Sequence, residues 1–133
     1  MSQEKVELVR RGYEAFAQDD IEAALAMLHP DIQIEDHDRS LETPTTYKGR
    51  DGFLSLFATV NEGFSDVRYI PEDVTEVGDR VLAEVRRTGR GTASGAPVDE
   101  RQFHVWDVVA DHAISFRVYL ERDQALDDVG PLE

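Results

Sequence analysis

The sequence contains no cysteine and no apolar run long enough to cross a membrane. The absence of cysteine excludes disulfides, thiolate metal sites and cysteine nucleophiles. The absence of a long apolar run excludes a transmembrane helix. The first residues, from Met1 to Lys5, lead directly into an amphipathic pattern that does not resemble a signal peptide. We therefore expect a cytoplasmic protein.

Basic residues are also scarce. Lysine and arginine together number 14, against 28 aspartates and glutamates, which gives a net charge of −14. A field of this sign repels phosphate backbones and anionic lipids, so nucleic acids and membrane surfaces are poor candidates as partners. The length of 133 residues predicts a single domain, residues 1–133, that is large enough to bury a core around a cavity.

One short stretch, residues 28–38, joins a helical pattern to a strand pattern. From Ile32 the side chains alternate, so Ile32, Ile34 and Asp36 share one face of a strand. The two isoleucines indicate that this face is buried, and a buried carboxylate is costly unless it is paired, hydrogen-bonded or protonated. Asp36 is therefore a candidate for chemistry. The alternative is a strand that ends earlier and leaves Asp36 in a solvated turn with Asp38.

Apolar residues at helical spacing predict the helices. The first helix is expected over residues 3–18, with a capped start at Ser2, and the second runs from a cap at Asp19-Asp20 to His29-Pro30. The third begins at residues 50–52 and ends at residues 61–63. A short closing helix is expected over residues 121–129 and ends at Gly130-Pro131. The tail after Gly130 is expected to be loose.

Alternation with period two predicts the strands. After the strand that carries Asp36, residues 38–49 are typical of a loop. Further strands are expected from Val67 to about Val74 with a bend or edge at Pro71, and over residues 81–92, 101–109 and 113–120. Helices followed by antiparallel strands indicate an α+β fold, with the helices on one face of a curved sheet.

The last two strands differ in how clearly their faces can be assigned. In the last strand Ile114, Phe116, Val118 and Leu120 form an apolar face opposite Ser115, Arg117 and Tyr119. In the strand before it, Gln102, His104 and Trp106 share one face, while Phe103 and Val105 share the other. Alternation alone does not decide which of these two faces points inward.

Several motifs, taken in order, carry a family resemblance. They are Asp20-Ile21-Glu22-Ala23 before Leu28-His29-Pro30-Asp31, the run from Tyr47 to Gly52, His104-Val105-Trp106, and the run from Phe116 to Arg122 with Ala125-Leu126. In these motifs the chain resembles the SnoaL-like branch of the nuclear-transport-factor-2-like superfamily, which also contains steroid isomerases, polyketide cyclases and limonene epoxide hydrolases. The resemblance covers nearly the whole chain. It implies a mixed, mostly antiparallel sheet that forms a cone, with three helices on its concave face and a pocket between them.

The resemblance also implies site residues. Asp36 falls where steroid isomerases keep the aspartate that shuttles a proton, and His104 falls where they keep a protonated aspartic acid in the oxyanion hole. Their helix-one tyrosine falls on Gly12, with Tyr13 one position away on a different helical face. These two departures argue against ketosteroid isomerisation itself. The strand of His104 also lacks the arginine and aspartate, two apart, that epoxide hydrolysis in this superfamily uses.

A carboxylate that faces an imidazole across an apolar pocket can hold it in one tautomer and exchange a proton near neutral pH. We therefore expect Asp36 and His104 to be catalytic and to approach hydrogen-bond distance, directly or through one water. The alternative is a buried pair that only satisfies two polar groups. The substrate-binding residues are expected to be Tyr13, Phe16, Ile34, Phe53, Phe57, Trp106, Phe116, Val118 and Leu120. No metal is expected, because His37 and Asp38 lack a suitably spaced partner ligand.

Three functions stay open. The preferred hypothesis is a cofactor-independent isomerase, cyclase or lyase that transfers a proton on an apolar carbonyl compound. The alternatives are a non-catalytic protein that binds a small apolar ligand and a structural dimerisation module. A homodimer is expected through Ser115, Arg117 and Tyr119 on the convex side of the sheet, because the resemblance implies dimers and a half-apolar outer face needs cover.

Overall fold

The computed structural model describes residues 3–37 and 45–130. In chain order the elements are α1 (Gln3–Ala17), α2 (Ile21–Ala26), β1 (Leu28–Asp36), β2 (Thr45–Lys48), α3 (Gly49–Gly63), β3 (Phe64–Val77), β4 (Arg80–Gly91), β5 (Pro97–Val109), β6 (His112–Tyr119) and α4 (Arg122–Val129). The cap predicted at Ser2, the loop residues 38–44 with Asp38, and the tail from Pro131 lie outside the described residues. Within the described part of the chain, no helix has both the length and the apolar character that a membrane span requires.

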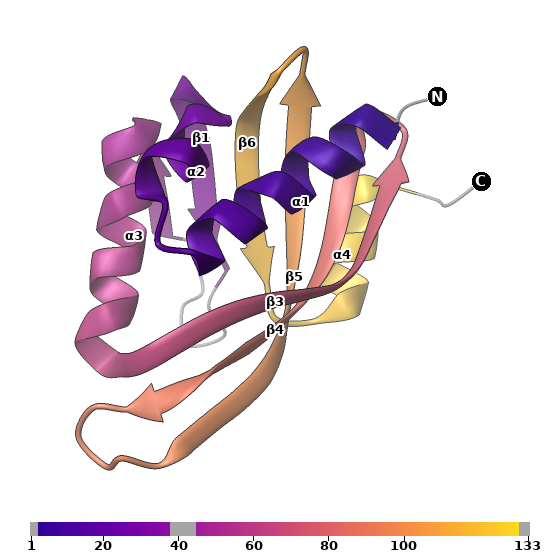
Figure 1. Ribbon diagram of the computed structural model, residues 1–133. Helices are drawn as coiled ribbons and strands as arrows, with labels where there is room; N and C mark the ends of the chain where they lie inside the picture. Colours follow the sequence, from indigo (N-terminus) through magenta and orange to yellow (C-terminus); the bar gives the residue numbers. More distant parts are fainter. Residues whose placement is uncertain (1–2, 38–44, 131–133) are drawn as a thin grey trace.

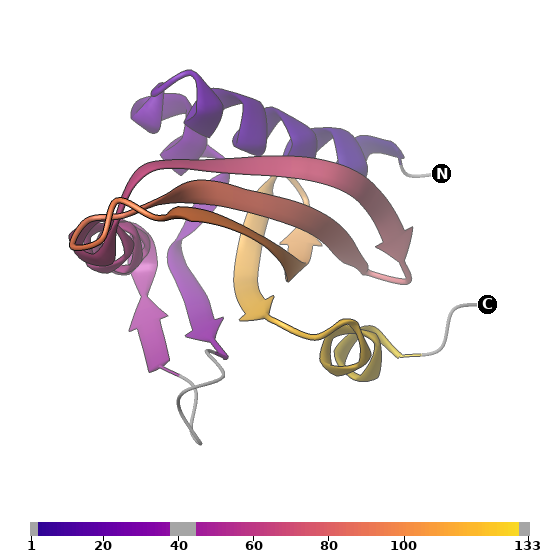
Figure 2. The same ribbon diagram turned by 90° about the horizontal axis from the view of Figure 1, so that it is seen from below.

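The strands form one mixed sheet in the order β2-β1-β6-β5-β4-β3. Among the described strands only the pair β1 and β6 is parallel, and the other neighbouring pairs are antiparallel. The sheet is curved but not closed, and α1, α2 and α3 lie on its concave side (Figure 1). Figure 2 shows α4 on the opposite side of the sheet from α1. The predicted α+β fold with three helices on a curved sheet is confirmed, and α4 is a fourth helix outside it.

The main hydrophobic core fills the concave side, between the sheet and the first three helices. Its fully buried members include Val9 from α1, Ile32 and Ile34 from β1, and Phe116 from β6. Burial of each such side chain contributes roughly 1.5–3 kcal/mol to folding. The pattern Ile32, Ile34, Asp36 therefore does mark the inward face of β1.

A second, smaller core lies on the convex side, under α4. Phe103, Val105 and Tyr119 from the sheet pack there against Ala125 and Val129 of the helix. Both faces of β5 are thus buried, which explains why alternation could not assign them. The face with Trp106 belongs to the main core, so Gln102 and His104, which alternate with it, also point toward the first three helices.

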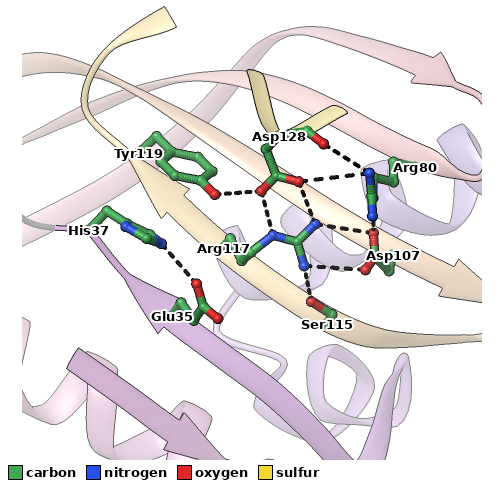
Figure 3. A network of polar contacts seen from close by, with 8 residues as sticks. All are labelled: Glu35, His37, Arg80, Asp107, Ser115, Arg117, Tyr119 and Asp128. Carbon is green, nitrogen blue, oxygen red and sulfur yellow. Dashed lines mark hydrogen bonds and ion pairs between the residues drawn. The ribbon is translucent and has the colours of Figure 1, made fainter. Parts of the chain in front are cut away.

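Beside this second core lies a network of charged side chains, drawn in Figure 3. Arg117 lies between two carboxylates: its Nε donates to Asp128 at 2.5 Å and its Nη1 to Asp107 at 3.2 Å. The Tyr119 hydroxyl donates to the same Asp128 at 2.5 Å. Arg117 and Tyr119 therefore lie on the outer face as predicted, but α4 of the same chain covers them. The homodimer stays a prediction.

The second helix is shorter than its pattern predicts. α2 ends at Ala26, and Leu28 already belongs to β1. The Leu28 carbonyl accepts two hydrogen bonds from the Arg50 guanidinium, at 3.0 and 2.7 Å, and the Met27 carbonyl accepts one from the Ala113 backbone N–H at 2.9 Å. These contacts with distant parts of the chain replace the helical hydrogen bonds that the local pattern indicates.

Residues 45–48, predicted as part of a loop, form the short strand β2. It pairs antiparallel with β1, so that Thr45 lies opposite Asp36 and Lys48 opposite Gln33. A strand of four residues is too short for alternation to reveal it. Gly49 follows with a φ of 77°, a left-handed conformation that glycine adopts without steric cost and that turns the chain into α3.

The inward face of β6 is also shorter than predicted. Ile114 is 37% exposed, because the pairing of β5 with β6 shifts register between Asp107 and Val108 and buries Ala113 instead. A bulge of this kind moves one side chain to the other face. Phe116 and Val118 point inward as expected, while Leu120 follows the end of the strand and is half-buried.

Candidate functional site

Four buried polar side chains form a continuous hydrogen-bonded chain in the main core. The Trp106 Nε1–H donates to the Tyr13 hydroxyl at 3.0 Å, and that hydroxyl donates to Nδ1 of His104 at 2.6 Å. Nε2 of His104 then donates to Oε1 of Gln102 at 2.9 Å. We call these four residues the buried chain. Because Tyr13 gives its one hydrogen to Nδ1, His104 is held in the tautomer that carries its proton on Nε2.

The secondary structure brings these residues together. Gln102, His104 and Trp106 are spaced two apart on β5 and so form a row on its inward face. Tyr13 lies one helical turn after Val9 on the buried face of α1. The sequence comparison had put Tyr13 on a different helical face from the tyrosine of the isomerases, yet its hydroxyl reaches the site.

The buried chain is electrically neutral. Burial lowers the pKa of His104 to about 3, and the positive charge of Arg87 acts in the same direction. Burial raises the pKa of Tyr13, although the hydrogen bond from Trp106 opposes this effect. At pH 7 the imidazole is therefore uncharged, because neither solvent nor a carboxylate stabilises a second proton on it. The proton exchange near neutral pH that the sequence suggested for His104 does not fit this environment.

Two small cavities adjoin the imidazole. The first, which we call the Tyr13 cavity, measures about 30 Å³ and is lined by Gly12, Tyr13, Phe16, Ala24, Met27, Phe53, Phe57, Tyr69, His104, Trp106 and Phe116. The second, the Asp36 cavity, measures about 20 Å³ and is lined by Asp36, Leu56, Phe57, Val60, Tyr69, Arg87, Gln102, His104, Phe116 and Val118. Each has room for about one water molecule.

Asp36 and His104 border one cavity, as expected, but they do not form a directly hydrogen-bonded dyad. Asp36 is half-buried at the end of β1, opposite Val118 of β6. Both ring nitrogens of His104 are occupied, one by Tyr13 and the other by Gln102. The strand alternation placed the carboxylate correctly, whereas the partners of the imidazole come from α1 and from its own strand.

The predicted substrate-binding residues fall into two groups. Those that line the two cavities are Tyr13, Phe16, Phe53, Phe57, Trp106, Phe116 and Val118. Ile34 and Leu120 line neither cavity, and Ile34 is part of the close-packed core. Strand alternation does not separate residues that only pack from residues that border space, because both occupy the same inward face of a strand. Substrate binding by these nine residues stays a prediction.

Three polar residues that line the two cavities were not predicted as site residues. Gln102 shares a face with His104, and that spacing was a usable signal. Tyr69 and Arg87 come from β3 and β4, and their place beside Asp36 depends on how far the sheet curves. Burial raises the pKa of Tyr69, and the nearby Arg87 charge opposes that effect. Arg87 pairs with Glu100, so the positive charge beside the Asp36 cavity is partly balanced.

No group of three histidine, aspartate or glutamate side chains within residues 3–37 and 45–130 is arranged to hold a metal ion. His37, considered as a ligand from the sequence, instead pairs with Glu35 at 2.9 Å on the outer face of the sheet (Figure 3). Its ring stacks on Tyr119, with 4.5 Å between the centroids.

The family of the protein can be stated from its sequence and geometry together. The SnoaL-like domain family matches residues 9–116. The chain belongs to this family. The matched region runs from α1 into β6 and contains Tyr13, Asp36 and His104. Comparison with curated proteins finds no significant match.

Solved structures of similar proteins share the whole fold. A nuclear-transport-factor-2-like protein of unknown function from Burkholderia pseudomallei is 23% identical, with a TM-score of 0.77 over 98% of this chain and 100% of that one. TerC, crystallised with polyporic acid, is 21% identical, with a TM-score of 0.76 over 93% of this chain and 96% of that one. A candidate SnoaL-like polyketide cyclase from Jannaschia is 22% identical, with a TM-score of 0.74 over 95% of this chain and 92% of that one. At these identities the likeness establishes the fold.

Proposed function

We propose that this SnoaL-like protein is a cofactor-independent, cytoplasmic enzyme that transfers a proton on a small, apolar carbonyl compound. The observation that carries the proposal is the shared cavity of Asp36, Gln102 and His104, with the imidazole held in one tautomer. A carboxylate and an oriented hydrogen-bond donor beside one small apolar space are the two groups that enolisation requires. The likeness to a candidate polyketide cyclase agrees with carbonyl chemistry.

Asp36 acts as the base in this proposal. Its carboxylate takes the proton from the carbon next to the substrate carbonyl, and the electron pair moves to the carbonyl oxygen as an enolate. The proton returns to a different carbon in an isomerisation, or the enolate carbon attacks an electrophilic carbon in a cyclisation. Asp36 suits this role because it lies at the edge of the core, where the carboxylate is not fully removed from water.

Gln102 acts as the donor to the developing enolate oxygen. Its Oε1 accepts the hydrogen bond from His104, so its amide N–H group is the part that can donate to a ligand in the Asp36 cavity. His104 is then a positioning residue that fixes the orientation of Gln102, and Tyr13 fixes His104 in turn. A neutral donor of this kind matters most as negative charge develops on the substrate.

The proposal can be tested without knowing the product. The assay follows, by NMR in D₂O, the exchange of hydrogen for deuterium next to the carbonyl group in a panel of neutral cyclic ketones. Asp36→Asn should lower the exchange rate by at least about 100-fold, since it removes the base. Glu35→Gln is the matched control, because Glu35 directly precedes Asp36 in β1 but lies on the outer face. Equal exchange rates in Asp36→Asn and the wild type would refute the proposal.

A further inference from the structure

A large cleft opens beside the two inner cavities. It measures about 730 Å³ and is lined by residues from the end of α1, the start of α2, α3 and the first half of β3. Small-molecule sites are commonly of about 300–1,000 Å³. Five large apolar side chains are exposed among the described residues, and three of them, Ile21, Leu54 and Ile70, line this cleft. Such a concentration of exposed apolar surface in one concavity is typical of a binding site.

Three aromatic rings separate this cleft from the Tyr13 cavity. Phe16, Phe57 and Tyr69 line both spaces. The ring centroids of Phe16 and Phe57 are 4.7 Å apart, those of Phe57 and Tyr69 5.5 Å, and those of Phe16 and Tyr69 6.0 Å. We call these three rings the aromatic wall. All three side chains are half-buried, so none is locked into the core on every side.

The sizes of the two spaces make the aromatic wall important. The Tyr13 cavity holds about 30 Å³, whereas the cleft holds about 730 Å³. A cyclic ketone cannot fit into space for one water molecule. A ligand that comes from the cleft to Asp36 must therefore displace at least one ring of the aromatic wall.

The charges around the cleft indicate what kind of ligand it accepts. Its rim carries Asp19 and Asp66 together with Arg68. The two carboxylates outnumber the single guanidinium, and the whole chain has a net charge of −14. An anionic ligand would be repelled, whereas a neutral flat ring can stack on the aromatic wall and bury apolar surface against Leu54 and Ile70.

We propose that the cleft is the outer half of the ligand site, that it holds a neutral flat ring system, and that the aromatic wall opens to pass the carbonyl end of the ligand to the Asp36 cavity. That the ligand is a substrate rests on the proposed function. The binding of a ring system in the cleft does not depend on any reaction, and it can be measured separately.

The first experiment measures binding in the cleft with prodan, a neutral naphthyl ketone whose emission shifts to the blue in apolar surroundings. Ile70→Thr should weaken prodan binding at least about threefold, because it removes apolar surface from the cleft. Ile114→Thr is the matched control: it is the same substitution in another strand, at 37% exposure against 41% for Ile70, and Ile114 does not line the cleft. Equal affinities of the wild type and Ile70→Thr would overturn the proposal, as would a loss confined to Ile114→Thr.

The second experiment measures opening of the aromatic wall. Trp106 is the only tryptophan of the chain, is 2% exposed and lines the Tyr13 cavity, so its fluorescence reports access to that cavity. Phe57→Ala should raise the quenching constant for acrylamide at least about twofold, since it removes a ring that lines both the cleft and the cavity of the indole. Phe64→Ala, a half-buried phenylalanine outside the cleft, should leave quenching unchanged. Phe16→Ala tests the same wall from α1 if Phe57→Ala does not fold.

Unchanged quenching in a folded Phe57→Ala or Phe16→Ala protein would overturn the role of the aromatic wall.

The two proposals can also fail separately. Asp36→Asn tests the reaction, because it should lower the rate of deuterium exchange at least about 100-fold. Ile70→Thr tests the cleft, because Ile70 lines the cleft and neither inner cavity. If no ketone exchanges while Ile70→Thr still weakens prodan binding, the enzymatic proposal fails and the cleft remains a ligand site. If deuterium exchange depends on Asp36 but Ile70→Thr leaves the affinity for prodan unchanged, only the cleft proposal fails.

Discussion

The two faces of β5 and β6 carry polar clusters of opposite character. On the concave face the buried chain links Trp106, Tyr13, His104 and Gln102 through neutral groups. On the convex face the cluster is ionic, with Arg117 between Asp107 and Asp128 (Figure 3). Strand β5 supplies His104 and Trp106 to one side and Asp107 to the other, where Arg117 of β6 joins it. The difference therefore comes from what covers each face.

Access to water explains the contrast. The concave face lies under three helices, and removal of a charge from water there costs several kcal/mol, so the polar groups are neutral and satisfy one another. The convex face has only the short α4 over it, and the side chains of Arg117 and Asp107 are 13% and 25% exposed. Charges are tolerated at such a boundary when each finds an opposite partner.

The pKa shifts on the two faces have different causes. On the concave face, burial alone accounts for most of the low pKa of His104. On the convex face, burial would raise the pKa of Asp128, but hydrogen bonds from Arg117 and Tyr119 outweigh it and lower the pKa. Both pKa shifts make the folded state less stable in acid. The effect of His104 begins at mildly acidic pH, where an ordinary histidine binds a proton. The effect of Asp128 begins only below about pH 4, which is the pKa of an aspartate in the unfolded chain.

The largest expected effect is the dependence of stability on pH. His104 stays neutral in the folded protein down to about pH 3, against an ordinary pKa of 6.5. Between these values the unfolded chain binds one more proton, so the free energy of unfolding should fall by roughly 5 kcal/mol as the pH drops through this range. His104→Gln should remove this contribution to the dependence of the free energy of unfolding on pH.

Urea denaturation at several pH values between about 8 and 4 measures this slope. The control is the slope of the same variant above about pH 7, where an ordinary histidine is already neutral and the two proteins should agree. Identical slopes in acid for the wild type and His104→Gln would mean that His104 is not held neutral by burial.

The next largest effect tests the ionic cluster. Arg117→Met should lower the free energy of unfolding by about 3 kcal/mol, because it leaves the Asp107 and Asp128 carboxylates with the more exposed Arg80 as their only shared cation in the network of Figure 3. Arg86→Met, at the exposed pair with Asp99, should cost less than about 0.5 kcal/mol. Chemical denaturation at neutral pH measures both. Equal losses in the two variants would show that partial burial does not distinguish the two sites.

The third prediction tests the buried chain through the hydroxyl of Tyr13. Tyr13→Phe should lower the free energy of unfolding by about 2 kcal/mol, because both Nδ1 of His104 and Nε1 of Trp106 lose their partner in a site with little water. Thermal and urea unfolding measure the loss. The control is Tyr47→Phe, because Tyr47 is a half-buried tyrosine that is not part of the buried chain. Its free energy of unfolding should change by less than about 0.5 kcal/mol. A loss no greater than in this control would contradict the buried chain.

The smallest effect completes the comparison, because it makes the same substitution on the convex face. Tyr119→Phe removes the donor to Asp128, but Arg117 still binds that carboxylate. The cost should be about 0.5–1 kcal/mol. Urea unfolding of Tyr13→Phe and Tyr119→Phe side by side gives the difference between the two faces directly. A larger loss for Tyr119→Phe would reverse the ranking.

The sequence by itself determined the parts of the protein that depend on local periodicity. The spacing of Val9, Tyr13 and Phe16 gave α1, and the alternation of Ile32, Ile34 and Asp36 gave the inward face of β1. These predictions hold because a helix or strand places its side chains by geometry that neighbouring residues share. The motifs from Asp20 to Leu126 also indicated the family, because their order reflects the order of elements in the fold.

Tertiary structure alone decided which of these side chains meet. The row Gln102, His104, Trp106 was visible in the sequence, but its inward direction depended on α4 covering the other face of β5. The partner of Nδ1 of His104 depended on the crossing of α1 over the sheet, which brings Tyr13 to it across 91 residues of chain. Local periodicity fixes the direction of a side chain only relative to its own helix or strand. Distances between elements follow from the curvature of the sheet and the packing of the helices, which the whole chain determines together.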